Sequence, residues 1–362
     1  MINSSENNKT DLRNLTEEQL VAFAESLHQP AFRGRQIMAW LYRPGITDFS
    51  QMTDLAKEFR AILAEKAYIS QFSNPLLEKA SDGCVKFGFH LFDGQMIEAV
   101  LIPEPDRNTL CISSQIGCAM GCTFCLTGTM GFIRNLTTAE IVNQVVAARD
   151  YLAEQPPETL IGSNRVTNVV FMGMGEPLNN LENVLDALSI MTNQKGMSLT
   201  TRKLTVSTCG IVPKLPELGE NTSCNLAVSL HSVKNSVRSE LMPVNRRWPV
   251  EELLDACRNY PLPKRKRIMF EYTLLEGIND SPTDALLLAK KLRDIPCKIN
   301  LLSFNACPEL PFRSPPREKV LQFQKILLDA HYTVFIRSSR GSDISAACGQ
   351  LATKNQQEIK QV

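Results

Sequence analysis

Apolar residues recur at helical spacing in three segments near the start of the chain. Thr16, followed three residues later by Gln19, forms a capping box that is typical of a helix beginning. Residues 1–15 carry no such pattern and are predicted to form a disordered tail. We therefore expect a small helical accessory domain over 16–72. The predicted helices span 16–28, 33–42 and 53–67.

The next part of the chain alternates apolar and polar residues over short runs, which is typical of strands. The turn signals Asp82-Gly83 and Asp93-Gly94 separate these runs. A three-stranded β-meander is therefore predicted as an extension over 73–105. Its strands are expected at 76–80, 85–91 and 96–102.

From residue 110 onward, strand-like runs alternate with helical patterns. Repeated strand and helix units predict a parallel sheet, either open or curled into a barrel, over 106–340. A short C-terminal segment, 341–362, follows. The strands are predicted at 110–114, 166–172, 204–207, 225–230, 268–274, 299–304 and 334–337. The helices are predicted at 138–154, 181–191, 250–260, 283–294 and 317–331.

Residues able to carry chemistry follow the predicted strand ends. In barrels of this type the active site forms at the C-terminal ends of the strands, so one mouth is expected to collect them. They are Cys118, Cys122, Cys125, Gly173, Gly175, Glu176, Ser207, Cys209, Ser229, His231, Asn305 and Cys348.

The spacing of Cys118, Cys122 and Cys125 suits ligands of one inorganic centre. A structural zinc site needs a fourth ligand, and the next cysteine and histidine are Cys209 and His231, far along the chain. A four-iron, four-sulfur cluster would instead keep one iron open for a small molecule. Three buried thiols with no metal, or a zinc site completed from a distance, remain as alternatives.

Composition and charge bear on where the protein is located and on whether it binds RNA. The chain has 362 residues, 11 cysteines and a net charge of +1, and it contains no apolar run of membrane-spanning length. A cytoplasmic protein with reduced thiols is expected. Residues 261–362 hold 16 Lys and Arg against 10 Asp and Glu, and the run 264–267 is entirely basic. Such a run contacts RNA phosphates or simply faces solvent.

Glu98 shares a strand face with the apolar residues Met96, Val100 and Ile102. Burial on that face would raise the pKa of its carboxyl group and suit it to accept a proton. The alternative is an edge strand on which Glu98 faces water.

Two longer stretches carry a family resemblance. CISSQIGCAMGCTFCLTG around the three cysteines, and DISAACGQL around Cys348, resemble the RlmN/Cfr family of radical S-adenosylmethionine (SAM) RNA methyltransferases. The likeness extends from Phe32 to Leu351. It implies a partial (β/α)6 TIM-like barrel, and a [4Fe-4S] cluster on Cys118, Cys122 and Cys125 whose open iron binds SAM.

The resemblance also assigns roles to residues around the cluster. It implies that Cys348 is first methylated by one SAM molecule and that the resulting methyl group, activated by a radical from a second SAM, is added to adenine. Glu98 then removes the ring proton. Cys111, otherwise a candidate core thiol, resolves the cross-link through a transient disulfide with Cys348. The implied SAM contacts are Gly175, Glu176, Ser207, Ser229, Leu230, His231 and Asn305.

The resemblance favours C2 of adenine as the target over C8, because Gly175-Glu176-Pro177 and Arg340-Gly341 are closer to the C2 pattern. The implied partners are 23S rRNA, tRNA and an electron donor such as a flavodoxin, with no membrane. A non-catalytic RNA-binding protein with a structural iron–sulfur or zinc site is the alternative from another class. The remaining thiols are expected to be structural, namely Cys84, Cys224, Cys257, Cys297 and Cys307.

Overall fold

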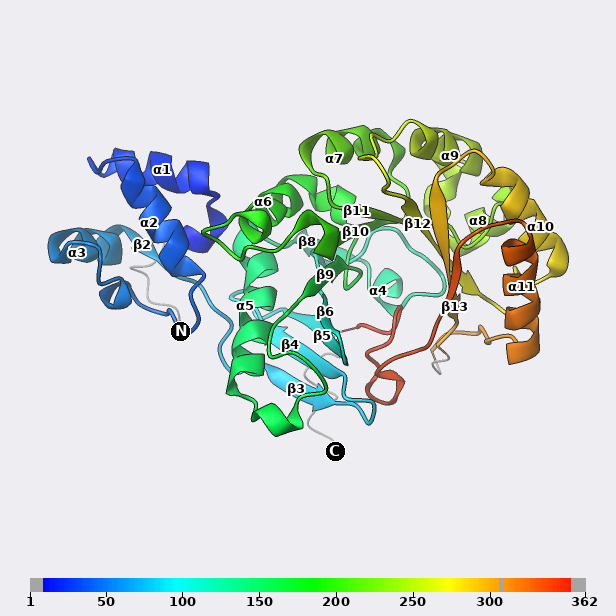
Figure 1. Cartoon of the computed structure of the whole chain (residues 1–362), viewed down its shortest axis with the longest axis horizontal. Coiled ribbons are helices and arrows are strands. Elements are labelled where there is room, and N and C mark those ends of the chain that lie inside the picture. Colours follow the sequence, from blue (N-terminus) through cyan, green and yellow to red (C-terminus); the bar gives the residue numbers. More distant parts are fainter. Residues whose placement is uncertain (1–8, 306–308, 353–362) are drawn as a thin grey trace.

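The computed structural model describes residues 9–305 and 309–352. Its N-terminal part is a helical group at one end of the molecule (Figure 1). The predicted capping box is confirmed: the Thr16 hydroxyl accepts from the Gln19 amide, and the Gln19 side chain accepts from the Thr16 amide at 2.8 Å. Such a cap stabilises a helix by about 1 kcal/mol. The helices are α1 (Glu17–Ser26), α2 (Phe32–Leu41) and α3 (Lys57–Lys66).

The segment before these helices is ordered. Strand β1 (Thr10–Asp11) pairs in parallel with β2 (Ala67–Tyr68). The Arg13 side chain is almost fully buried, and its guanidinium donates to the Ser70 carbonyl at 2.7 Å and to Asn143 Oδ1 at 3.0 Å. The predicted disordered tail is therefore wrong for residues 10–15. The pattern misled because a buried cation whose terminal nitrogens are hydrogen-bonded looks like a solvent-facing residue in sequence.

Within the described residues, ten strands form one mixed sheet in the order β14-β13-β12-β11-β10-β9-β6-β5-β4-β3. At one end of this order, β3, β4 and β5 are the predicted three-stranded meander, and β5 also pairs antiparallel with β6, the first predicted barrel strand. Gly83 and Gly94 take positive φ at the two predicted turns. Strand β5 lies between β4 and β6, so it is not an edge. These strands are β3 (Leu76–Lys79), β4 (Val85–His90), β5 (Met96–Glu104) and β6 (Arg107–Cys111).

The other part of the sheet is parallel, and a helix follows each strand from β6 to β13. This is the predicted partial (β/α)6 barrel, curved around a central space in Figure 1. The strands are β9 (Asn168–Phe171), β10 (Leu204–Thr208), β11 (Asn225–Ser229), β12 (Ile268–Leu274), β13 (Cys297–Ser303) and β14 (Val334–Arg337). The helices are α5 (Thr138–Glu154), α6 (Leu181–Thr192), α7 (Leu215–Asn221), α8 (Asn235–Leu241), α9 (Val250–Arg258), α10 (Pro282–Lys291) and α11 (Arg317–Asp329).

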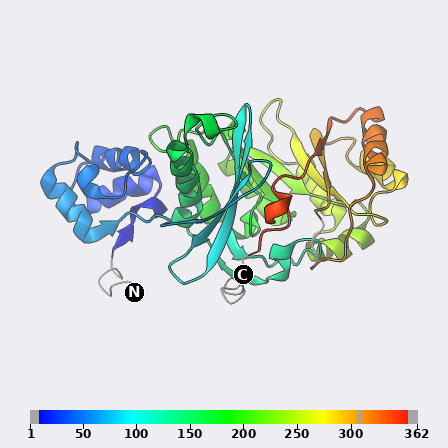
Figure 2. The same cartoon turned by 90° about the horizontal axis from the view of Figure 1, so that it is seen from below.

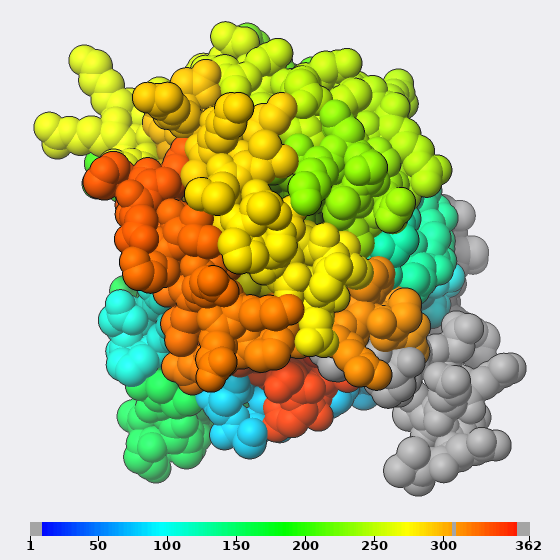
Figure 3. All heavy atoms as spheres, turned by 90° about the vertical axis from the view of Figure 1, so that its right-hand side faces the viewer, coloured from blue at the N-terminus to red at the C-terminus, as the bar shows by residue number. Residues whose placement is uncertain are grey.

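After β14 the chain returns to the antiparallel strands, as the red segment in Figure 2 shows. The Arg340 guanidinium pairs with Asp82 at 2.8 Å, and Lys86 Nζ donates to the Ile344 carbonyl at 2.9 Å. Figure 3 shows the same segment at the surface beside the residues of α11 (orange). The last described residues are thus fixed across the open side of the barrel.

Every helix in the described ranges is either too short or too polar to cross a bilayer.

Candidate active site

A small hairpin fixes the loop that carries the three cysteines. Strand β7 (Gln115–Gly117) pairs with β8 (Phe132–Asn135), which closes the ends of the loop, and the Cys118 amide donates to the Gly131 carbonyl at 2.9 Å. Gly117 has φ +68°, and a Cβ there would lie 1.8 Å from the Gly131 carbonyl oxygen. Only glycine fits this crossing, directly before the first cysteine.

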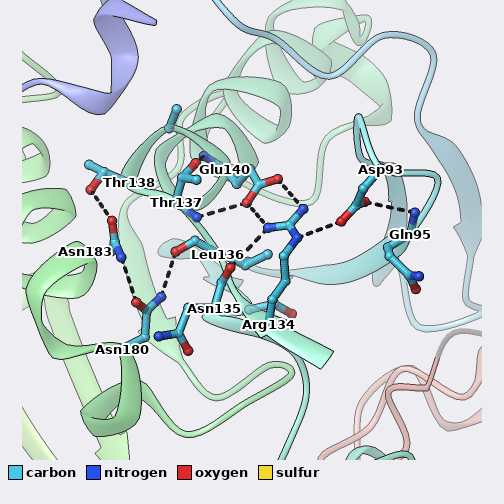
Figure 4. Close-up of polar contacts among 12 residues, drawn as sticks. Asp93, Gln95, Arg134, Asn135, Leu136, Thr137, Thr138, Glu140, Asn180 and Asn183 are labelled. Atoms are coloured by element: carbon cyan, nitrogen blue, oxygen red, sulfur yellow. Dashed lines mark hydrogen bonds and ion pairs between the residues drawn. The ribbon is translucent and has the colours of Figure 1, made fainter. Parts of the chain in front are cut away.

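Polar contacts connect this hairpin to the barrel (Figure 4). Arg134 pairs with Asp93 in the β4–β5 turn at 2.7 Å and with Glu140 of α5 at 2.7 Å. Asn180 donates to the carbonyls of Ser114 at 2.9 Å and Leu136 at 2.8 Å, one on each arm of the hairpin. The loop is therefore held by the sheet extension, by α5 and by the segment after β9.

Cys118, Cys122 and Cys125 line one cavity of about 180 Å³. Burial raises the pKa of Cys118 to about 12, and the pKa of Cys122 is raised by burial and then by the other two thiols. No three Cys, His, Asp or Glu side chains in the described part of the chain are arranged to hold a single metal ion. Three thiols around one cavity instead fit an iron–sulfur cluster, in which separate irons each take one thiolate. Metal binding displaces the proton of each thiol.

The expected SAM-contacting residues converge on this cavity from the ends of successive strands. Leu230 is the exception: its side chain is fully buried and is not among the lining residues, because at the end of β11 it points into the core. The lining includes Gly175, Glu176, Ser207, Ser229, His231, Asn305 and Cys348 together with the three loop cysteines.

Glu176 is oriented by backbone amides. Its carboxylate accepts from Cys209 at 2.7 Å and from Leu178 at 3.0 Å. Burial raises the pKa of this carboxyl group, and the two amide hydrogen bonds oppose that rise. A carboxylate offers about four acceptor positions, so it retains capacity for an ammonium group in the cavity.

His231 is fixed as a neutral hydrogen-bond donor. Its Nδ1 accepts from the Thr273 amide at 2.9 Å, and burial, with a smaller effect of Arg238, lowers its pKa to about 3. Nε2 therefore carries the proton. The ring packs edge-on against Phe124, at 4.7 Å between centroids, next to the third cysteine.

Cys348 is held over the same cavity by contacts of its own segment. The Leu126 amide donates to the Gly349 carbonyl at 2.8 Å, and the Thr127 hydroxyl donates to the Leu351 carbonyl at 2.6 Å. The thiol is exposed at the surface of the lined space, yet surrounding protein raises its pKa to about 11.

Arg337 and Arg340 are close to Cys348 in sequence, and a nearby cation lowers the pKa of a thiol. In the structure they do not bring the pKa of Cys348 below its ordinary value. Arg337 lowers the pKa of Cys348, but its effect is smaller than those of burial and of Glu271. Arg340 is paired with Asp82 instead.

A second, larger space adjoins the first. This basic groove, about 1140 Å³, is lined by Cys111 and Cys348 and shares Glu271, Asn305 and Cys348 with the cavity. Cys111 ends β6, and its pKa is raised by burial and further by Cys348, so the two thiols act on one another. The cationic residues of the groove are Arg107, Arg202, Lys264, Arg265, Lys266, Arg267, Lys298, Arg337 and Arg340.

Glu98 lies beneath the C-terminal segment on β5 and is 6% exposed, so the edge-strand alternative is wrong. Its carboxylate accepts from the Ala352 amide at 3.1 Å and pairs with Lys86 Nζ at 3.5 Å. Burial raises its pKa to about 7 despite the opposing charge of Lys86. It lines neither space.

Two buried charged residues at the site were missed from sequence. Arg238 of α8 is fully buried and donates to the carbonyls of Cys209, Ser229 and Leu230. Glu271 of β12 is 7% exposed and lines both spaces. A charged residue within a short helix such as α8 gives no pattern that separates it from a solvent-facing one. A carboxylate in a strand as apolar as β12 was the available signal.

The other cysteines follow expectation where they are described. Cys84, Cys224, Cys257 and Cys297 are buried free thiols. Cys209 lines the cavity beside Glu176 and is also a free thiol. Cys307 lies outside the described residues.

Comparison with known proteins identifies two matching families. Residues 10–69 match the ribosomal RNA large subunit methyltransferase N-terminal domain, and residues 112–289 match the radical SAM superfamily. The chain is 66% identical over 345 residues to the dual-specificity RNA methyltransferase RlmN of Desulfotalea psychrophila, covering 95% of each chain. It is 52% identical to the corresponding Geobacter sulfurreducens protein, covering 95% of this chain and 92% of that one. A radical SAM methyltransferase from Sphaerobacter thermophilus is 42% identical, with a TM-score of 0.87 over 95% of this chain and 100% of that chain.

Proposed function

The chain belongs to the RlmN family of radical SAM RNA methyltransferases, and from this we infer how its own residues carry out the reaction. It is a SAM-dependent enzyme that methylates C2 of adenine in rRNA and tRNA, and it uses a [4Fe-4S] cluster. We assign its targets to an adenosine in the peptidyl-transferase region of 23S rRNA and to one beside the anticodon of tRNAs.

One observation carries the assignment of roles: Cys348 lines both the cysteine-lined cavity and the basic groove. A sulfur in that position has access to a methyl donor on one side and to RNA on the other. Cys118, Cys122 and Cys125 would hold the cluster. Glu176, His231 and the other lining residues named above would hold SAM; for Leu230, only a backbone contact is compatible with its buried side chain.

The bound cluster and SAM supply a 5'-deoxyadenosyl radical. Every other step falls to the protein. Cys348 carries the methyl carbon and presents it to the adenine. Glu98 accepts the proton that leaves C2. The Cys111 thiol then loses its proton and its sulfur attacks the Cys348 sulfur, so that the disulfide forms as the bond from the Cys348 sulfur to the methylene carbon breaks. That carbon takes up a proton and becomes the methyl group of the released base, and a thiol reductant restores the two cysteines before the next turnover.

We propose a helical accessory domain that includes residues 10–15 as well as 16–72, followed by a β-extension over 73–105, the barrel over 106–340 and the methyl-carrying segment 341–362. Its RNA substrates place the enzyme in the cytoplasm, where a flavodoxin would supply the electron.

The function is tested by anaerobic reconstitution with iron, sulfide and SAM, with reduced flavodoxin as the electron source. We expect 5'-deoxyadenosine and RNA containing 2-methyladenosine, measured by nucleoside mass spectrometry. Cys122→Ala, which removes one ligand, is expected to give neither product. 8-Methyladenosine as the sole product would overturn the C2 assignment, and product with dithionite but not with flavodoxin would exclude that donor.

The basic groove supplies charge of the sign that RNA phosphates require. Two of its arginines are already paired, Arg107 with Glu104 and Arg340 with Asp82. Lys264 and Arg265 are exposed at its rim. We propose that this groove guides the RNA strand to Cys348.

Replacing Lys264 and Arg265 together by alanine is expected to weaken RNA binding roughly tenfold or more. The slope of log affinity against log salt should fall by about 1 to 2, because RNA binding with fewer phosphate contacts releases fewer counterions. Fluorescence anisotropy with a labelled RNA hairpin over a salt series measures both quantities. Lys325→Ala, on the outer helix α11, is the matched control. Unchanged affinity and slope in the double variant would place the RNA elsewhere.

A further inference from the structure

Glu271 is a buried carboxylate that the reaction described above leaves without a role. It lies on β12 opposite Asn300 of β13, and Asn300 Nδ2 donates to its Oε1 at 2.8 Å. Asn300 is itself 4% exposed. The amide therefore fixes one carboxylate oxygen and leaves the other toward the cavities that Glu271 lines.

Glu271 and Cys348 stand at the junction of the two spaces. Both line the cysteine-lined cavity and both line the basic groove. Among the side chains that act on the Cys348 thiol, Glu271 has the largest effect and Cys125 the next, and both raise its pKa; Arg337 has a smaller effect in the opposite direction. Arg337 also acts on Glu271, so the three groups form one electrostatic cluster.

The protonation states of this pair pose a chemical problem. The Cys348 side chain is exposed on the lined space, but protein on its other sides limits its hydration, and this together with Glu271 raises the pKa of the thiol to about 11, so the sulfur is protonated at neutral pH. A thiol is a poor nucleophile, and methylation of this sulfur requires loss of its proton. Burial raises the pKa of Glu271 to about 7, which lies near the working pH of a general base.

We propose that Glu271 is the general base that takes the proton of the Cys348 thiol when that sulfur is methylated. As the bond between the Cys348 sulfur and the methyl carbon forms, the bond from that carbon to the SAM sulfonium breaks. S-Adenosylhomocysteine leaves as a neutral thioether, and Glu271 holds the proton until water removes it. Asn300 is the positioning residue for this carboxylate.

Glu271 is better placed than Glu98 for this first proton, because Glu271 lines both spaces together with Cys348. The Glu98 carboxylate is bound by the Ala352 amide and Lys86. We therefore assign Glu271 to the sulfur on this geometry, whereas the assignment of Glu98 to the adenine rests on the family resemblance. This division rests on the proposed role of Cys348 as methyl carrier.

The test follows methylation of Cys348 in the cluster-containing protein without RNA, by mass spectrometry of the peptide over time after addition of SAM. Glu271→Gln is expected to slow methylation about 100-fold. Asn300→Ala is expected to slow it about tenfold, because the carboxylate loses its orientation. Glu276→Gln, an exposed carboxylate after the same strand, is the matched control and should keep the wild-type rate.

A second measurement separates a base from a structural residue. In the same protein, the pH profile of Cys348 alkylation by iodoacetamide is expected to move to lower pH in Glu271→Gln, since removing the negative charge lowers the pKa of the thiol. The proposal is supported if Glu271→Gln methylates Cys348 more slowly than the wild-type protein but is alkylated at lower pH. Methylation at the wild-type rate in Glu271→Gln or Asn300→Ala, or a joint loss of methylation and alkylation, would overturn it. Absence of methyl on Cys348 in the wild-type protein would instead reject the proposed function.

Discussion

Replacing Cys111 by alanine is expected to leave the enzyme covalently joined to its RNA. Cys348 carries the methylene carbon onto the adenine, and Cys111 is the thiol that shares the basic groove with it. Without Cys111, no sulfur is placed to break the bond between the carbon and Cys348. We expect turnover to fall about 1000-fold, as for loss of a residue that acts in the covalent step. A denaturing gel with labelled RNA would show the protein–RNA adduct.

Cys348→Ala provides the contrast, because it removes the atom to which RNA becomes attached. This variant is expected to be equally inactive but to form no adduct, and the double variant with Cys111→Ala should also form none. Cys297→Ala, a buried thiol of β13, is the control for general loss of a cysteine. Equal turnover by Cys111→Ala and Cys348→Ala close to that of the wild type would exclude both roles.

Glu98→Gln is expected to slow release of the methylated base about 100-fold, the usual contribution of a positioned base. Burial raises the pKa of Glu98 to about 7. Its carboxyl group is therefore protonated and unable to accept a proton below pH 7, and it becomes active as pH rises through 7. The rate of product release in a single turnover should rise over that interval in the wild type, and the Gln variant should lose this rise.

Glu78→Gln is the matched control, since Glu78 also pairs with Lys86, at 3.0 Å, but its own side chain is exposed. This variant should keep the wild-type profile with at most a small displacement. A rise of unchanged size and midpoint in Glu98→Gln would assign the proton transfer to another group.

The spacing of apolar residues predicted most of the fold, because buried positions recur with the repeat of the helix or strand that carries them. Helix α5 was predicted with its observed bounds, and each of the seven predicted barrel strands overlaps an observed strand. The elements that periodicity missed are short. Helices α7 and α8 have seven residues each, too few for an amphipathic pattern to repeat.

The site residues were predicted from two sources, their position after predicted strand ends and the family resemblance. That reasoning brought Glu176, His231 and Cys348 to one cavity, as the structure does. For Leu230 the side chain lies in the core, because successive side chains along a strand point to opposite faces, and only its backbone remains for a contact with SAM. The reasoning also missed Arg238 and Glu271, whose burial depends on packing against neighbouring barrel strands and loops.

The attachment of the C-terminal segment has a consequence for biosynthesis. Its hydrogen bonds to Lys86 and Thr127 join residues separated by 258 and 224 positions. A ribosome releases the N-terminal side of each pair long before the other, so the cysteine loop and most of the barrel emerge first. Chains that stop before position 348 have the three loop cysteines but lack the reactive sulfur. The ability to transfer a methyl group therefore appears late in translation, and such incomplete copies cannot modify RNA.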